Sequence, residues 1–73
     1  MSENDFIQNL LANGVDPSCV VFDNNVSDGY FIRKNYYRWE IGFRERGAEY
    51  YVRGFPSESQ AFEQLYNDIL KNK

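Results

Sequence analysis

The chain has 73 residues, of which 42% are hydrophobic and 26% charged, and its formal net charge is −3. This composition is typical of a single small globular domain over residues 1–73, and it excludes an intrinsically disordered chain. With no histidine and one cysteine, the sequence also excludes Ser-His-Asp and Cys-His catalysis, zinc sites and an internal disulfide. We therefore expect a protein without enzyme activity, cofactor or metal ion.

The N-terminal residues and the absence of long apolar runs bear on location. Residues 1–5 contain two acids and lack the basic-then-apolar order of a signal peptide. No apolar run approaches the ~20 residues that span a bilayer. Together with the single cysteine, these features predict a cytoplasmic protein that does not bind membranes.

The first predicted element is a helix over residues 3–13. Ser2 and Asp5 have the spacing of a capping box, in which each side chain accepts a hydrogen bond from the other residue's backbone amide. Phe6 and Leu10 belong to an apolar stripe at helical spacing, and Gly14 is placed to end the helix.

Two short segments follow this helix. Residues 19–22 favour β structure but are few, and they predict either a strand or an extended lead-in. Residues 23–29 are polar and predict a turn. A calcium-binding EF-hand loop beginning at Asp23 would need Gly and Glu where Asp28 and Lys34 stand, so we expect no calcium site there.

The centre of the chain predicts a β-hairpin. Apolar and polar residues alternate over residues 37–44, and Arg46-Gly47 fits a two-residue hairpin turn. Counting outward from this turn predicts the cross-strand pairs Phe43–Tyr50, Ile41–Val52, Arg44–Glu49 and Glu40–Arg53, with Tyr51 opposite Gly42. The two opposite-charge pairs would each stabilise this register by ~0.2–1 kcal/mol.

A further strand is predicted over residues 29–33. A turn at residues 34–37 would place Ile32 opposite Trp39 and Tyr30 opposite Ile41. The same register places Arg33 opposite Arg38, and these like charges oppose it.

The last predicted element is a helix over residues 58–71, with a capping box at Ser57 and Gln60 and an apolar stripe that includes Leu65. The order is therefore helix, three-stranded antiparallel meander, helix. This is an α+β fold in which both helices pack on the Trp39 face of the sheet and leave the other face open.

The open face of the predicted sheet supplies the candidate partner-binding residues. Phe31, Arg33, Arg38 and Tyr51 are predicted to lie there, and protein interfaces are enriched in these residue types. A plain solvated face is the alternative interpretation. Residues 29–54 carry a net charge of +3 and the remainder −6. The acidic remainder would suit a basic protein partner.

Four segments resemble small immunity proteins encoded beside bacterial contact-dependent and polymorphic toxins. They are Tyr30-Phe31-Ile32-Arg33, Arg38-Trp39-Glu40, Glu45-Arg46-Gly47 and Phe55-Pro56-Ser57-Glu58-Ser59-Gln60-Ala61. The similarity extends over residues 29–70. It implies a cytosolic protein that binds one cognate toxin domain tightly and neutralises it without catalysis.

Two other functions stay open at this stage. The first is a nucleic-acid-binding module that uses the sheet face, since the element order matches double-stranded RNA-binding domains. Glu58 stands near the position where that family carries phosphate-binding lysines, so nucleic acid is the less favoured partner. The second is a small regulatory or phage-type protein that binds an unrelated protein. A homodimer could also form through the edge strand over residues 29–34, unless residues 19–22 cover it.

Overall fold

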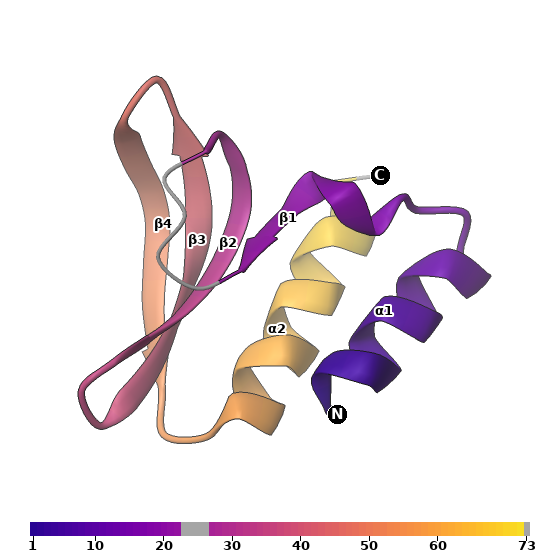
Figure 1. The fold of residues 1–73 in the computed structure, drawn as a ribbon, viewed down its shortest axis with the longest axis horizontal. Coiled ribbons are helices and arrows are strands. Elements are labelled where there is room, and N and C mark those ends of the chain that lie inside the picture. Colours follow the sequence, from indigo (N-terminus) through magenta and orange to yellow (C-terminus); the bar gives the residue numbers. More distant parts are fainter. Residues whose placement is uncertain (23–26, 73) are drawn as a thin grey trace.

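The computed structural model describes residues 1–22 and 27–72, whose arrangement is shown in Figure 1. The elements in chain order are α1 (Glu3–Ala12), a 3-10 turn η1 (Pro17–Cys19), β1 (Val20–Phe22), β2 (Gly29–Asn35), β3 (Arg38–Glu45), β4 (Ala48–Phe55) and α2 (Glu58–Lys71). The strands described form one sheet in the order β1-β2-β3-β4, and both helices pack against one face of it. The predicted α+β class is therefore confirmed. No helix among these residues is long and apolar enough to cross a membrane.

Both helices begin at the serine caps that the sequence predicts. The Ser2 side chain accepts a hydrogen bond from the Asp5 amide and the Asp5 side chain accepts one from the Ser2 amide, which completes the capping box. Ser57 accepts a hydrogen bond from the Gln60 amide in the same way. The bounds of α2 agree with the prediction, whereas α1 ends one residue before the predicted position.

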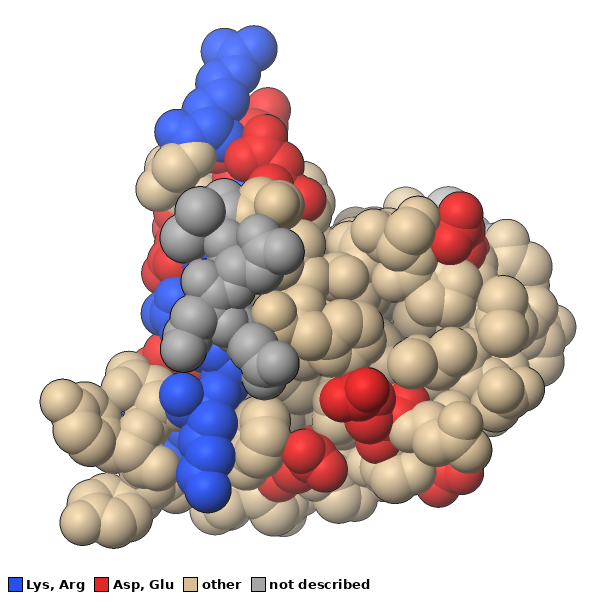
Figure 2. All heavy atoms as spheres, in the orientation of Figure 1, with Lys and Arg blue, Asp and Glu red and all other residues tan. Residues whose placement is uncertain are grey.

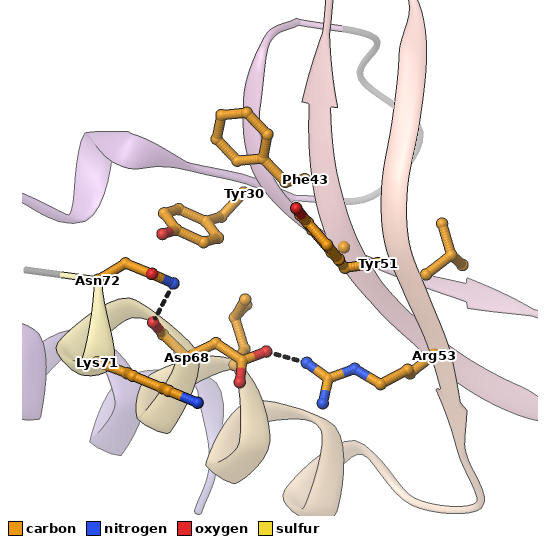
Figure 3. A pocket seen from close by; sticks show the side chains of 10 residues that line it. Tyr30, Phe43, Tyr51, Arg53, Asp68, Lys71 and Asn72 are labelled. Carbon is orange, nitrogen blue, oxygen red and sulfur yellow. Dashed lines mark hydrogen bonds and ion pairs between the residues drawn. The ribbon is translucent and has the colours of Figure 1, made fainter.

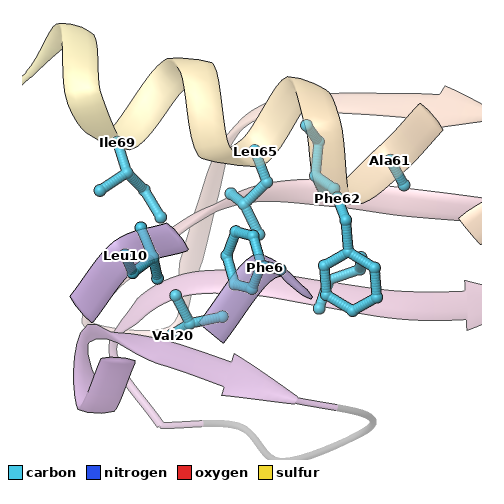
Figure 4. Packing of buried hydrophobic residues seen from close by; sticks show 9 residues of the cluster. Phe6, Leu10, Val20, Ala61, Phe62, Leu65 and Ile69 are labelled. Atoms are coloured by element: carbon cyan, nitrogen blue, oxygen red, sulfur yellow. The ribbon is translucent and has the colours of Figure 1, made fainter. Parts of the chain in front are cut away.

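The core lies between the helices and the sheet. Figure 4 shows Phe6 and Leu10 of α1 beside Phe62, Leu65 and Ile69 of α2, and all five are buried. The rings of Phe6 and Phe62 are 4.9 Å apart between centroids. Fully burying each large apolar side chain contributes about 1.5–3 kcal/mol, so these contacts hold α1 to α2. The same cluster includes Val20, Ile32 and Ile41 of the sheet.

The prediction of three antiparallel strands is wrong, because residues 20–22 form a fourth strand. This strand, β1, pairs in parallel with β2, and Val20 lies beside Tyr30 in that register. Val20 is buried in the core, and the Phe22 ring lies 6.4 Å from that of Phe62. Burial of these side chains selects the strand over the extended lead-in. Part of the turn predicted over residues 23–29 lies outside the described residues.

The β3–β4 hairpin follows the predicted register only near its turn. The pairs Phe43–Tyr50 and Arg44–Glu49 are confirmed. A register shift then occurs between Ile41 and Phe43, so that Ile41 pairs with Arg53 instead of Val52. Glu40 likewise pairs with Gly54 instead of Arg53. Two residues of β4, 51 and 52, therefore stand where regular pairing allows one, which is the definition of a β-bulge.

The β2–β3 hairpin is shifted by two residues from its predicted register. Ile32 pairs with Ile41, and Arg33 pairs with Glu40 rather than with Arg38. The connection is the two-residue turn at Tyr36 and Tyr37 rather than a four-residue turn. The observed register replaces a like-charge pair with an opposite-charge pair, which explains why it is preferred.

Candidate protein-binding surfaces

On the sheet face opposite the helices, Phe31 is fully buried beneath two guanidinium groups. The Arg33 and Arg44 guanidinium carbons lie 4.8 Å and 4.7 Å from the centre of its ring. This is cation–π geometry, and it is strengthened where the cations are partly desolvated. Phe31 was predicted to contact a partner directly. Its burial makes it instead the support on which the two arginines lie.

These arginines belong to a network of ion pairs, which we call the arginine–glutamate network. Arg33 Nε lies 2.9 Å from Glu40 Oε1, and Arg33 Nη1 lies 2.7 Å from Glu49 Oε2. Arg44 Nη2 lies 2.9 Å from the same Glu49 oxygen. Arg38 joins at the margin, with Nη2 3.3 Å from Glu40 Oε2 and 64% of its side chain exposed. Three arginines and two glutamates thus nearly neutralise one another.

The network shifts the pKa values of its members. Hydrogen bonds from Arg33 and then Arg44 lower the pKa of Glu49 to about 2. Burial raises the pKa of Glu40, but hydrogen bonds from Arg33, Asn35 and Arg38 outweigh this effect and leave the pKa below its ordinary value. Both glutamates therefore remain ionised at neutral pH, so Arg33 and Arg44 are already paired within the protein.

Tyr51 lies apart from the other three predicted site residues. The bulge in β4 gives it a φ of 59°, and 81% of the residue is exposed. It lines a groove of about 480 Å³ between the sheet and the C-terminal half of α2, which we call the bulge groove. Arg33 and Arg38 are thus brought together at Glu40, whereas Tyr51 lies at a different surface.

The bulge groove combines an aromatic wall with a polar rim (Figure 3). The rings of Tyr30 and Phe43 meet edge to face, with centroids 5.2 Å apart. The other lining residues are Gly42, Tyr51, Val52, Arg53, Leu65, Asp68, Lys71 and Asn72. Such a mixture of aromatic surface with a few polar groups suits an apolar anchor from a partner.

An ion pair closes one side of the groove. Arg53 of β4 donates a hydrogen bond to Asp68 Oδ2 of α2, and Gln64 Nε2 donates to the other carboxylate oxygen at 3.0 Å. Asn72 Nδ2 donates to the Asp68 carbonyl at 2.9 Å. Both oxygens of Asp68 are thus already engaged, and this carboxylate holds β4 against α2.

Sequence reasoning missed most of this groove. Tyr30, Phe43 and Leu65 were predicted only as core residues, and Arg53 was paired with Glu40. The run Tyr50-Tyr51-Val52 was the available signal, since three bulky residues in succession interrupt strict alternation. Tyr36 and Tyr37, which the structure places at an exposed turn, were also not predicted as binding residues.

Comparison with known proteins gives no match, since no family model fits the chain and neither a curated protein nor a solved structure is detectably similar. The similarity to immunity proteins therefore stays a prediction from the sequence motifs.

Proposed function

We propose that this chain is a non-catalytic protein-binding domain, and that it acts in the bacterial cytoplasm as an immunity protein that neutralises a toxin domain. The observation that carries this proposal is Tyr51. It is a large aromatic residue, largely exposed, on left-handed backbone beside the bulge groove.

The backbone conformation of Tyr51 destabilises the folded state, and the packing of its side chain does not compensate for this. A residue with a Cβ in the left-handed region is disfavoured by roughly 1–2 kcal/mol, and Gly or Asn would be tolerated better. Because most of the Tyr51 residue is exposed, little apolar surface is buried in compensation. A residue in an unfavourable backbone conformation that brings no gain in stability is typical of a functional position.

The residues around Tyr51 suit a protein partner. Tyr50 and Val52 are exposed beside it, and the groove adds the Tyr30 and Phe43 rings. Tyrosine is enriched among the residues that carry most of the binding energy in protein interfaces. An apolar or aromatic side chain of the partner would enter the groove, while Arg53 and Asp68 would form part of the polar rim.

The charge distribution supports a basic partner such as a toxin domain. Outside residues 29–54 the chain carries a net charge of −6. In Figure 2, red carboxylates are visible on the helical side of the molecule, and much of the blue lies along the sheet. Complementary potentials accelerate association and suppress wrong partners.

The arginine–glutamate network argues against the sheet face as a nucleic-acid site. Phosphate binding releases counterions only where cations are available to replace them. Arg33 and Arg44 are held by Glu40 and Glu49 instead. We therefore favour a protein partner over RNA or DNA.

The direct test is affinity capture of the tagged protein from a lysate of its host, followed by mass spectrometry and a 260/280 nm absorbance ratio. We expect one stoichiometric protein partner without nucleic acid. Co-expression should then rescue growth against that partner. A nuclease-sensitive absorbance excess without a protein would contradict the proposal. If a protein partner is captured but co-expression does not relieve its toxicity, the chain is a protein-binding domain but not an immunity protein. A regulatory protein would give that result.

A matched pair of variants tests the role of Tyr51. Tyr51→Asn removes the ring at a φ of 59°, and Arg46→Asn makes the same replacement at a φ of 53° in the β3–β4 turn. We expect both to raise the free energy of unfolding by up to ~1 kcal/mol, because Asn tolerates this backbone region. Only Tyr51→Asn should weaken partner binding, by at least ~10-fold. Equal binding by the two variants would show that Tyr51 is not a contact.

A further inference from the structure

The turn between β2 and β3 presents two tyrosines that the fold does not use. We call residues 34–38 the tyrosine turn. Tyr36 is 88% exposed and Tyr37 is 96% exposed, and neither lines the bulge groove. Single exposed hydrophobic residues are common on protein surfaces. Two adjacent exposed aromatic rings at the end of a hairpin are less common, and exposed apolar patches mark interaction sites.

The backbone at this turn favours other residues. Tyr36 has a φ of 57°, and two-residue hairpin turns with positive φ are dominated by Gly, Asn and Asp. The opposite hairpin, β3–β4, follows this rule at one of its two turn residues, Gly47 at a φ of 83°, whereas Arg46 has a φ of 53°. Tyr36 therefore carries a conformational cost, and its exposure leaves that cost without compensation from packing.

The residues nearest the tyrosine turn carry positive charges, and the nearest acid along the chain, Glu40 of β3, pairs with Arg33 and Arg38. Residues 29–39 contain Arg33, Lys34 and Arg38 and no acid. Lys34 Nζ lies 5.9 Å from the centre of the Trp39 ring, and most of the Arg38 side chain is exposed. Two cations therefore flank the pair of tyrosines.

The shape of this end of the sheet also limits the partner. In Figure 1 the β2–β3 turn projects at the lower left, away from both helices, and in Figure 2 uncharged side chains project from that end next to blue ones. A projection requires a concave partner, whereas single-stranded nucleic acid is bound in positively charged grooves that follow its backbone.

We propose that the tyrosine turn inserts into a cavity of the partner protein whose wall is apolar and whose rim carries carboxylates. Tyr36 and Tyr37 would fill the cavity, and Lys34 and Arg38 would face the rim. This inference requires, from the proposed function, only that the partner is a protein. It depends neither on the bulge groove nor on toxin neutralisation.

Site-specific photocrosslinking in the host cell tests this placement. A photoreactive phenylalanine analogue would be introduced separately at positions 36, 37, 51 and, as an exposed control on α2, 63. We expect positions 36 and 37 to crosslink to one protein, through a peptide that contains Asp or Glu. Crosslinking from position 51 alone would overturn this inference and leave the proposed function intact. Crosslinking of the turn to nucleic acid, or from no position, would overturn both.

Binding of that protein then tests the two parts of the contact. Tyr36→Asn with Tyr37→Ser should weaken binding by at least ~10-fold while thermal unfolding shows that the fold is kept. Lys34→Gln with Arg38→Gln should reduce the association rate and its dependence on salt, because the rim carboxylates lose their counter-charges. Arg46→Gln, in the opposite turn, is the control. Unchanged affinity in the tyrosine variant, or unchanged salt dependence in the cation variant, would overturn the inference.

Discussion

Phe31 is buried on the sheet face opposite the helices because charged neighbours and a glycine together enclose its ring. Arg33 and Arg44 cover it, and Gly42 lies beside it on the adjacent strand. A Cβ at position 42 would lie 2.7 Å from Phe31 Cζ. The glycine is therefore required by the ring of Phe31, and not by that of Tyr51 as the predicted register implied.

Gly42→Ala tests this enclosure. The new methyl group would clash with the Phe31 ring and with the Tyr50 carbonyl oxygen at 3.0 Å, so we expect a loss of about 1–3 kcal/mol in the free energy of unfolding. Gly54→Ala is the control, because the atoms nearest its Cβ would belong to the flexible Arg38 side chain, and a change within ~0.5 kcal/mol is expected. Urea denaturation measures both. Equal effects would mean that Phe31 can move aside.

Glu49 makes stability depend on pH in the acidic range. Its pKa falls from an ordinary value of 4.5 to about 2 in the folded protein. The folded state therefore holds fewer protons than the unfolded state between these values, and its stabilisation is present above pH 4.5 and lost as the pH falls toward 2. Glu49→Gln should flatten the decline of thermal stability over this range. Glu63→Gln, on the exposed face of α2, should leave the decline unchanged, and equal profiles would exclude Glu49 as its source.

At the level of secondary-structure elements, local sequence signals predicted where helices and turns begin. The pairing of strands that are distant in the sequence was harder to predict. The serine caps located both helix starts, and Arg46-Gly47 located one turn, because each depends on neighbouring residues alone. The direction of β1 and the β2–β3 register depend on long-range burial. The bulge at residues 51 and 52 could not be derived from alternation, which assumes regular pairing.

Both edges of the sheet are protected against pairing, which bears on the predicted homodimer. Within the part of the chain that the structure describes, β1 has three residues, and β4, although eight residues long, is interrupted by its bulge. Short edge strands and bulges are recognised devices that oppose edge-to-edge association. They disfavour a dimer formed through either edge.

Deleting Tyr51 tests this role of the bulge. Val52 would then take the single position opposite Gly42, and the pairs Ile41–Arg53 and Glu40–Gly54 would be kept. We expect a folded protein with a regular, exposed β4 edge that self-associates more than the wild type at equal concentration. Sedimentation velocity measures this, with Tyr51→Asn as the control that keeps the extra residue. A deletion variant that folds and associates no more than the control would contradict the protective role.

At the scale of the whole molecule, the binding surfaces combine residues that are distant in the sequence. The bulge groove brings Tyr30, Tyr51 and Asp68 together from three elements. Tyr51 could be predicted as a binding residue from its expected exposure. Its separation from Arg33 and Arg38 could not be predicted, because it results from the bulge in β4. The tyrosine turn is contiguous in sequence. It was missed because Tyr37 fitted the alternation of the following strand.

The separation of charge between the helices and the sheet leads to a prediction about association kinetics. If the partner is a basic toxin domain, the acidic helices should accelerate its approach, and the rate should fall steeply as salt rises. Reversing the exposed Glu3 and Glu63 to Lys should slow association about 10-fold at low salt with little effect on dissociation. Surface plasmon resonance with the captured partner measures both rates, and Glu3→Gln with Glu63→Gln should give an intermediate rate. Association that is insensitive to these substitutions would exclude a basic partner facing the helices. If that association still depends on salt, the tyrosine turn remains the surface that first meets the partner.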